Sequence, residues 1–230
     1  MINKDSSLRF ALYVLGMLVL ALGISMNART SLGVSPIVSV AYSISAISGW
    51  NFGNVTFLVY IVFVCMEIAI HLAVRNRKAI VTDILQIVVS LIFTRFLNLF
   101  NAVIPDLGSV QLQGTFAGSI TGRILFLLLA ILLTGTGAAL SLNMRLVPNP
   151  GDGIVQTIGD AVKKDNGLVK NCVDITCVAF TCIVSLIFAH RIIGIGVGTL
   201  VAMIGVGRVI AVFNRLTREK TDALVKVYIK

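Results

Sequence analysis

Residues 143–162 read NMRLVPNPGDGIVQTIGDAV and lie between two long apolar runs. Pro150 suits the first turn of a helix, because the N–H that it lacks would have no helical partner there. The helix that follows carries Asp152, Gln156 and Asp160. A membrane-spanning helix needs about 20 residues, most of them apolar. The stretch therefore predicts a short helix that enters a membrane without crossing it.

The rest of the chain is very apolar, since 57% of its 230 residues are hydrophobic and 13% are charged. Soluble domains have about 45–50% and about 25%, respectively. The apolar residues form runs of about 20, the length that crosses a bilayer. A second short element, 34–48, is apolar enough to span if tilted, so the sequence leaves open whether it crosses or re-enters. We expect six spanning helices, at 10–28, 55–74, 79–104, 123–142, 171–189 and 192–214.

The two halves of the chain repeat one series of motifs, offset by 114 to 117 positions. In each half a long span is followed by an Asn-x-Arg motif, a Pro-led short element and two further long spans. We predict two membrane repeats, residues 1–110 and 111–216, and a basic cytoplasmic tail, 217–230. The motifs are Asn27-Ala28-Arg29 and Ser35-Pro36 in the first half, and Asn143-Met144-Arg145 and Asn149-Pro150 in the second.

The positions of Lys and Arg decide how the repeats are oriented, because basic loops of membrane proteins stay in the cytoplasm. Basic residues gather at 75–78, 163–170 and 215–230, whereas segment 99–120 has none. If both short elements re-enter, each repeat crosses three times, and all three basic clusters and both termini are cytoplasmic. The predicted fold is all-α, with six transmembrane helices plus two short re-entrant helices in two inverted-topology repeats. The exceptions to the charge rule, placed outside, are Arg29, Arg123 and Arg191.

The turns that begin the two short helices are the first candidate solute site. Inverted repeats with interrupted helices are typical of secondary transporters that bind their substrate at mid-membrane. Helix N-termini carry a partial positive charge, which favours an anionic or carboxylate-bearing solute. Asp152 opposes this preference, and it is either a helix N-cap or a ligand for a cation or an amine. The candidate residues are Ser35, Pro36, Asn149, Pro150, Gly151, Asp152 and Gly153.

A polar stripe on the helix at 79–104 is the second candidate. Its residues are spaced by three and four and share one helical face within about 120°. A stripe of this kind should face the bundle interior, where it either lines a solute path or hydrogen-bonds to other helices. Arg95 beside it either binds an anion or extends outward. The solute-binding candidates are Asp83, Gln86, Ser90, Thr94 and Asn98, with Arg95, and the stripe continues to Asn101.

Three ionisable residues inside the predicted spans are candidates for coupling to an ion. Glu67 and His71 are one helical turn apart and can relay a proton, although a pair at the membrane interface is the alternative. Asp174 is the other carboxylate within a span.

The sequence resembles the YczE/YitT-like bacterial membrane proteins in three short motifs. These are Leu32-Gly33-Val34-Ser35-Pro36, Pro150-Gly151-Asp152-Gly153 and Gly196-Val197-Gly198-Thr199, within about residues 10–214. Val38 stands where that family's first motif has an Asp. The family is described as uncharacterised or as transporters of unassigned substrate, so the resemblance implies the architecture and names no solute.

We expect a transporter of a small polar solute, working by alternating access in the cell membrane. The alternatives are the substrate-binding membrane subunit of a multi-component uptake system and a non-transporting accessory protein. Motifs of hydrolases and phosphate-binding enzymes are lacking, so we expect no enzyme activity and no cofactor or metal. The expected partners are the solute and the lipid bilayer, with a homo-oligomer left open. The net charge of +9 fits loops that face anionic lipid, without nucleic acid.

Overall fold

The computed structural model describes residues 4–226, and the described chain is helical throughout, apart from its turns. Two short α-helices, α2 (Pro36–Ser48) and α6 (Pro150–Val162), and a 3₁₀ turn, Val110–Leu112, accompany six long helices. All six long helices contain an apolar segment of 21 to 25 residues, enough to cross a bilayer. The six predicted spans are confirmed, and the chain is a multi-pass membrane protein. The long helices are α1 (Lys4–Arg29), α3 (Phe52–Ala73), α4 (Ala79–Val103), α5 (Ile120–Asn143), α7 (Asn166–Ala189) and α8 (Val197–Lys226).

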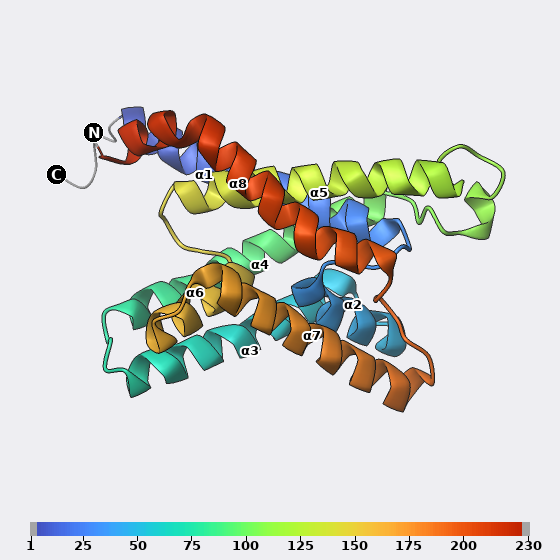
Figure 1. Ribbon diagram of the computed structural model, residues 1–230, viewed down its shortest axis with the longest axis horizontal. Helices are drawn as coiled ribbons and strands as arrows, with labels where there is room; N and C mark the ends of the chain where they lie inside the picture. Colours follow the sequence, from blue (N-terminus) through green and yellow to red (C-terminus); the bar gives the residue numbers. More distant parts are fainter. Residues whose placement is uncertain (1–3, 227–230) are drawn as a thin grey trace.

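The helices form two layers that lie closest in the middle of the molecule and diverge toward both ends (Figure 1). One layer contains α1, α5 and α8, and the other contains α2, α3, α6 and α7. Helix α4 joins them, because it packs against both α1 and α3. One end carries the basic turns 75–78 and 163–164, and we call it the basic end. The opposite end, with segments 104–119 and 190–196, is called the distal end.

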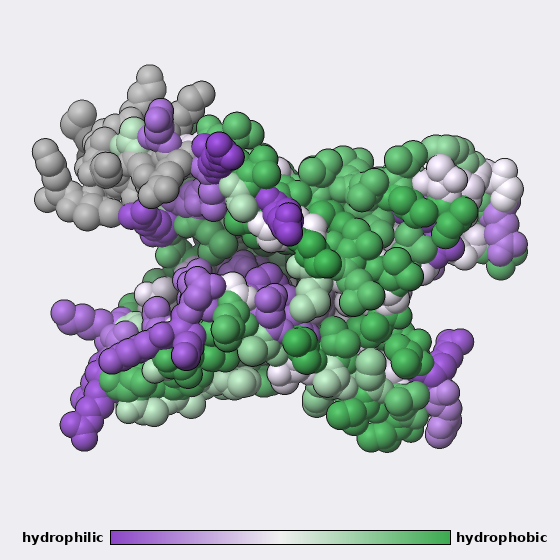
Figure 2. All heavy atoms as spheres, in the orientation of Figure 1, coloured by the Kyte–Doolittle hydropathy of each residue, from purple (hydrophilic) through white to green (hydrophobic). Residues whose placement is uncertain are grey.

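The surface of the molecule matches a membrane environment. Figure 2 shows apolar side chains over the middle of the helices and hydrophilic ones gathered toward the ends, above all the basic end. Val62, Val88 and Ile183 are among the large apolar residues that are more than half exposed. Two of the arginines that depart from the charge rule are bound locally at the distal end. Arg123 donates to the carbonyl oxygens of residues 30 and 31, and Arg29 donates to the carbonyl of residue 101.

Glycines set a close antiparallel contact between α1 and α5. A Cβ built on Gly23 would lie 2.5 Å from the backbone nitrogen of Thr134, and one on Gly137 would lie 2.3 Å from that of Leu20. Only glycine fits at such distances. The two contacts are equivalent, because Gly23 and Gly137 are 114 positions apart and so are Leu20 and Thr134.

The short helices α2 and α6 begin near each other in the middle of the bundle. A Cβ on Gly151 would lie 3.3 Å from Cγ2 of Ile37, its equivalent 114 positions earlier. Helix α2 ends beside the distal end, where Ser45 shares a hollow with Arg29 and Asp106. Helix α6 ends at the basic end (Figure 1).

The cap of α6 corrects one of the two interpretations of Asp152. The N-cap is Asn149, whose Oδ1 accepts a hydrogen bond of 3.1 Å from the backbone N–H of Gly151. Asp152 follows in the first helical turn, where a carboxylate is favoured by the helix dipole. The carboxyl of Asp152 is therefore free of the capping role.

Each short helix packs against the third helix of the opposite half, α2 on α7 and α6 on α3. In the first interface, hydroxyls of Ser39 and Thr181 lie 2.8 Å apart, and those of Ser43 and Ser185 lie 2.7 Å apart. Shifting each residue by 114 positions converts these pairs into Gly153 with Glu67 and Thr157 with His71. The second interface therefore has ionisable groups where the first has buried hydroxyl pairs.

Candidate functional site

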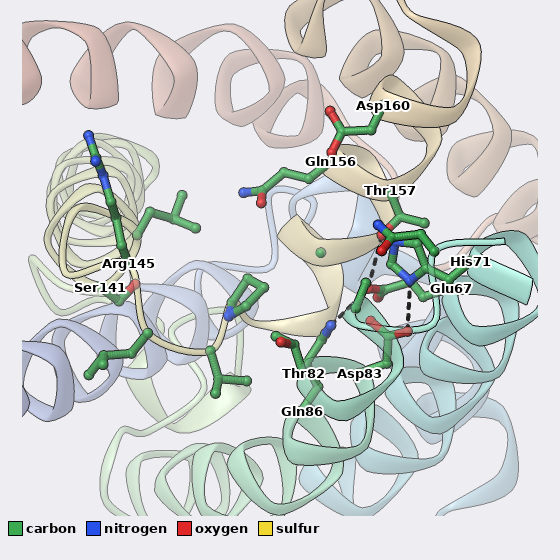
Figure 3. Close-up of a pocket in the computed structure, with 17 residues that line it drawn as sticks. Glu67, His71, Thr82, Asp83, Gln86, Ser141, Arg145, Gln156, Thr157 and Asp160 are labelled. Carbon is green, nitrogen blue, oxygen red and sulfur yellow. Dashed lines mark hydrogen bonds and ion pairs between the residues drawn. The ribbon is translucent and has the colours of Figure 1, made fainter. Parts of the chain in front are cut away.

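A polar hollow of about 390 Å³ opens at the basic end between the two layers. One wall is the C-terminal end of α5 with the loop residues 145–148 that follow it, and the other is formed by α3, α4 and α6 (Figure 3). Five of the predicted site residues line it, from three different elements: Glu67, His71, Asp83, Gln86 and Gly153. We call it the basic-end hollow.

Glu67 lies at the inner wall of the basic-end hollow and is 1% exposed. Its Oε2 accepts a hydrogen bond of 2.8 Å from Nε2 of Gln86 and one of 3.3 Å from the hydroxyl of Thr157. These donors come from α4 and α6, so the carboxyl of Glu67 joins three helices at one point (Figure 3). Rotation of any of the three would change its environment.

His71 and Asp83 form a buried hydrogen-bonded pair one helical turn nearer the basic end. Nδ1 of His71 lies 2.7 Å from Oδ2 of Asp83, and the two residues are 9% and 2% exposed. Glu67 and His71 therefore each contact the polar stripe of α4, as Figure 3 shows. The pair holds α3 and α4 together at the side of the hollow.

Because Gly153 has no side chain, the carboxyl of Glu67 can lie directly against α6. A Cβ at this position would lie 2.8 Å from Oε1 of Gln86 and 2.9 Å and 3.0 Å from the two carboxylate oxygens of Glu67. Among the described residues, Oε1 of Glu67 and Oε1 of Gln86 are buried polar atoms without a hydrogen-bond partner. Both acceptors are thus unsatisfied at the inner wall of the hollow.

Further polar residues line the outer part of the basic-end hollow. Gln156 and Asp160 project from α6, and Ser141 and Arg145 lie on the side of α5 (Figure 3). In the sequence, Gln156 and Asp160 indicated only that this helix is too polar to span. Thr157 completes the polar face of this amphipathic helix, and its spacing from Gly153 and Asp160 is the signal that would have found it.

Apart from Gly153, the predicted turn residues lie away from this hollow, around a small central cavity of about 70 Å³ between the N-termini of α2 and α6. Pro36 and Pro150 are buried at the first turns of their helices. Lys170 of α7 lines the same cavity and makes an ion pair of 2.8 Å with Asp174, which is 1% exposed. The predicted residues on the cavity wall are Ser35, Asn149, Gly151 and Asp152.

The polar stripe of α4 is divided among different surroundings. Ser90 and Thr94 are fully buried, and their hydroxyls bond to carbonyl oxygens of their own helix. Asn98 accepts a hydrogen bond of 3.0 Å from the N–H of Gly53 and lines a hollow of about 380 Å³ at the distal end. Arg95 is exposed and donates to Asn54. Only the first residues of the stripe, Asp83 and Gln86, reach the basic-end hollow.

The comparison with known families covers nearly all of these elements. One family model matches residues 7–215, from the start of α1 to the membrane-spanning part of α8. The chain belongs to a family of unknown function (DUF6198). No match is found among curated proteins or solved structures. The matched residues include all of those that line the basic-end hollow, and the family assigns no activity to them.

Proposed function

We propose that the protein is a secondary transporter that moves a small polar solute across the cell membrane by alternating access. The observation that carries the proposal is the basic-end hollow, where α3, α4, α5 and α6 bring together six buried polar side chains within a six-span bundle. Burying such groups without water or a ligand is costly, about 2–7 kcal/mol for each unpartnered group. A hollow of about 390 Å³ is within the range of small-molecule sites.

Two inverted repeats are part of this proposal, and three sets of equivalent contacts support them. Gly23 with Thr134 corresponds to Gly137 with Leu20. The interface of α2 with α7 corresponds to that of α6 with α3, and the packing of α1 on α4 to that of α5 on α8. The largest exception to this pairing is that α3 packs along α4, whereas α7 and α8 diverge. In transporters built from inverted repeats, the two halves adopt different conformations in each state, so that the substrate site is open to one side of the membrane.

Re-entry of the short helices is also proposed. Helix α1 reaches the distal end at Arg29, and α2 starts at the central cavity and returns to the distal end. Helix α6 follows the same course from the basic end. Non-spanning backbone is tolerated at this depth where other helices cover it, and Pro36 and Pro150 are both buried.

The basic end is the cytoplasmic one in this proposal, because it carries the turns with Arg75, Arg77, Lys78, Lys163 and Lys164. The state described is then open to the cytoplasm, with the central cavity closed above it. The resemblance to YczE/YitT-like proteins belongs to the same proposal, since its three motifs lie at the start of α2, the start of α6 and the start of α8.

Flux through the purified protein tests the proposal. Solutes that raise its melting temperature identify ligands, because a ligand that binds only the folded state stabilises it. Each such solute is then loaded into proteoliposomes that contain the chain alone. We expect saturable exchange of labelled solute above the rate of empty liposomes. Flux that strictly requires an added ATPase complex would contradict the proposal and favour a capture subunit, and stoichiometric co-purification without flux would favour an accessory protein.

A further inference from the structure

The inner wall of the basic-end hollow offers hydrogen-bond acceptors without donors to match. Oε1 of Glu67 and Oε1 of Gln86 both lack a partner, and both residues are 1% exposed. The donors nearby are already used: the amide nitrogen of Gln86 and the hydroxyl of Thr157 both bond to Oε2 of Glu67. A ligand group that donates hydrogen bonds would therefore match this wall.

The formal charges around the hollow favour a cation as well. Three carboxylates line it, Glu67, Asp83 and Asp160, against one guanidinium, Arg145, and one imidazole, His71. His71 is bonded to Asp83, and Arg145 lies at the exposed outer part of the hollow. The carboxyl of Glu67 is left without a cationic partner within hydrogen-bonding distance among the described residues. Burial of a carboxylate is stabilised most by such a partner.

The equivalent position in the other half of the chain shows what a purely structural contact looks like. There Ser39 and Thr181 take the places of Gly153 and Glu67, and their hydroxyls bond directly to each other. In that arrangement both hydroxyls have a partner, and neither is among the unpartnered buried polar atoms of the described residues. The substitution of a carboxyl for a hydroxyl introduces the charge, and that of glycine for serine makes room for the carboxyl itself.

We propose that the transported solute is a small organic cation with an ammonium or guanidinium group, which donates its N–H bonds to Oε1 of Glu67 and Oε1 of Gln86 beside Gly153. This inference rests on the proposed function and names its substrate class. Asp160 and Gln156 accept the more distant polar groups of the solute at the outer part of the hollow. The helix N-termini of the central cavity, which favour anions, are not the solute site in this scheme.

Ligand-induced stabilisation of the purified full chain tests the substrate class. The cationic probes are putrescine and agmatine, and succinate is the anionic one. We expect either cation to raise the melting temperature of the wild type, and succinate to leave it unchanged. In Glu67→Gln at least tenfold more of the cation should be needed, which corresponds to about 1.4 kcal/mol of binding free energy. Glu219→Gln, at an exposed position of α8 outside the hollow, is the matched control and should respond as the wild type.

A second variant keeps the test decisive if Glu67→Gln folds poorly. Gly153→Ala retains every charge but displaces the two acceptor oxygens, so the cation response should also fall at least tenfold. Gly207→Ala is its control, because nothing lies within 4 Å of a Cβ at that position. The proposal is overturned if succinate alone stabilises the wild type, if no cation does, or if both site variants respond as the wild type.

The flux assay separates this inference from the proposed function. If proteoliposomes exchange an anion and no cation binds, the proposed transport stands and the proposed cation site is contradicted. If a cation stabilises the protein in a way that depends on Glu67 but is not transported, the cation site stands and the proposed transport is contradicted.

Discussion

Close packing of α1 on α5 gives a quantitative prediction for two glycines. A Cβ at Gly23 would lie 2.5 Å from the nitrogen of Thr134, and one at Gly137 would lie 2.3 Å from that of Leu20. Ordinary contacts between carbon and other heavy atoms are about 3.5–4.0 Å, so alanine at either site separates the helices by about 1 Å. A gap of that size forfeits roughly a quarter to a half of the dispersion energy at each atom pair it opens. Overpacking of this kind costs about 1–3 kcal/mol.

The assay is the fraction of monodisperse protein after heating in detergent, measured by gel filtration. For a chain of this size about 1 kcal/mol shifts the melting midpoint by about 2–4 °C. Gly23→Ala and Gly137→Ala should each lower the midpoint by at least this amount, and by similar amounts because their contacts are equivalent. Gly207→Ala should keep or raise it, since alanine is favoured over glycine in a helix by about 1 kcal/mol. Wild-type midpoints for both interface variants would refute the reasoning.

Three further predictions concern the cap of α6, the buried pair of His71 and Asp83, and the topology. Asn149→Ala removes the N-cap hydrogen bond and should cost about 1 kcal/mol in thermal stability, whereas Asn149→Asp should melt as the wild type; equal loss in both would exclude capping as the cause. His71→Leu leaves the carboxylate of Asp83 buried alone and should destabilise by about 3–5 kcal/mol, and a double-mutant cycle with Asp83→Leu should recover part of it; strict additivity would show that the two do not interact. On a cysteine-free background, Trp50→Cys and Asn76→Cys should label from opposite sides of the membrane, and labelling from one side would remove the span at α3.

The helices were predictable because their signal is local. Each of the six long spans is a run of apolar residues, and run length alone separates a spanning helix from a short one. The short helices were predictable for a similar reason, since Pro36 and Pro150 mark their starts. The N-cap was not, because Asn149 and Asp152 both suit a cap, and only the backbone geometry distinguishes them.

The candidate site was predictable only in part. The spacing of Asp83 and Gln86 placed them on the inner face of their helix, and the structure brings both to the basic-end hollow. The stripe could not be a single site, however, because Asp83 and Asn101 are about 27 Å apart along a helix that rises 1.5 Å per residue. The approach of Gly153 to Glu67 depends on how α6 packs on α3. No pattern within either helix encodes that contact.

Reciprocal accessibility of the two hollows tests the central claim of alternating access most directly. Gln156→Cys places a thiol in the basic-end hollow, and Ser45→Cys places one in the distal hollow. Each is reacted with a membrane-impermeant thiol reagent in inverted and right-side-out vesicles, with and without a solute that stabilises the protein. Alternating access predicts that the solute changes the two reaction rates in opposite directions, because one hollow closes as the other opens. Rates that change together, or that the solute leaves unchanged at both positions, would contradict it.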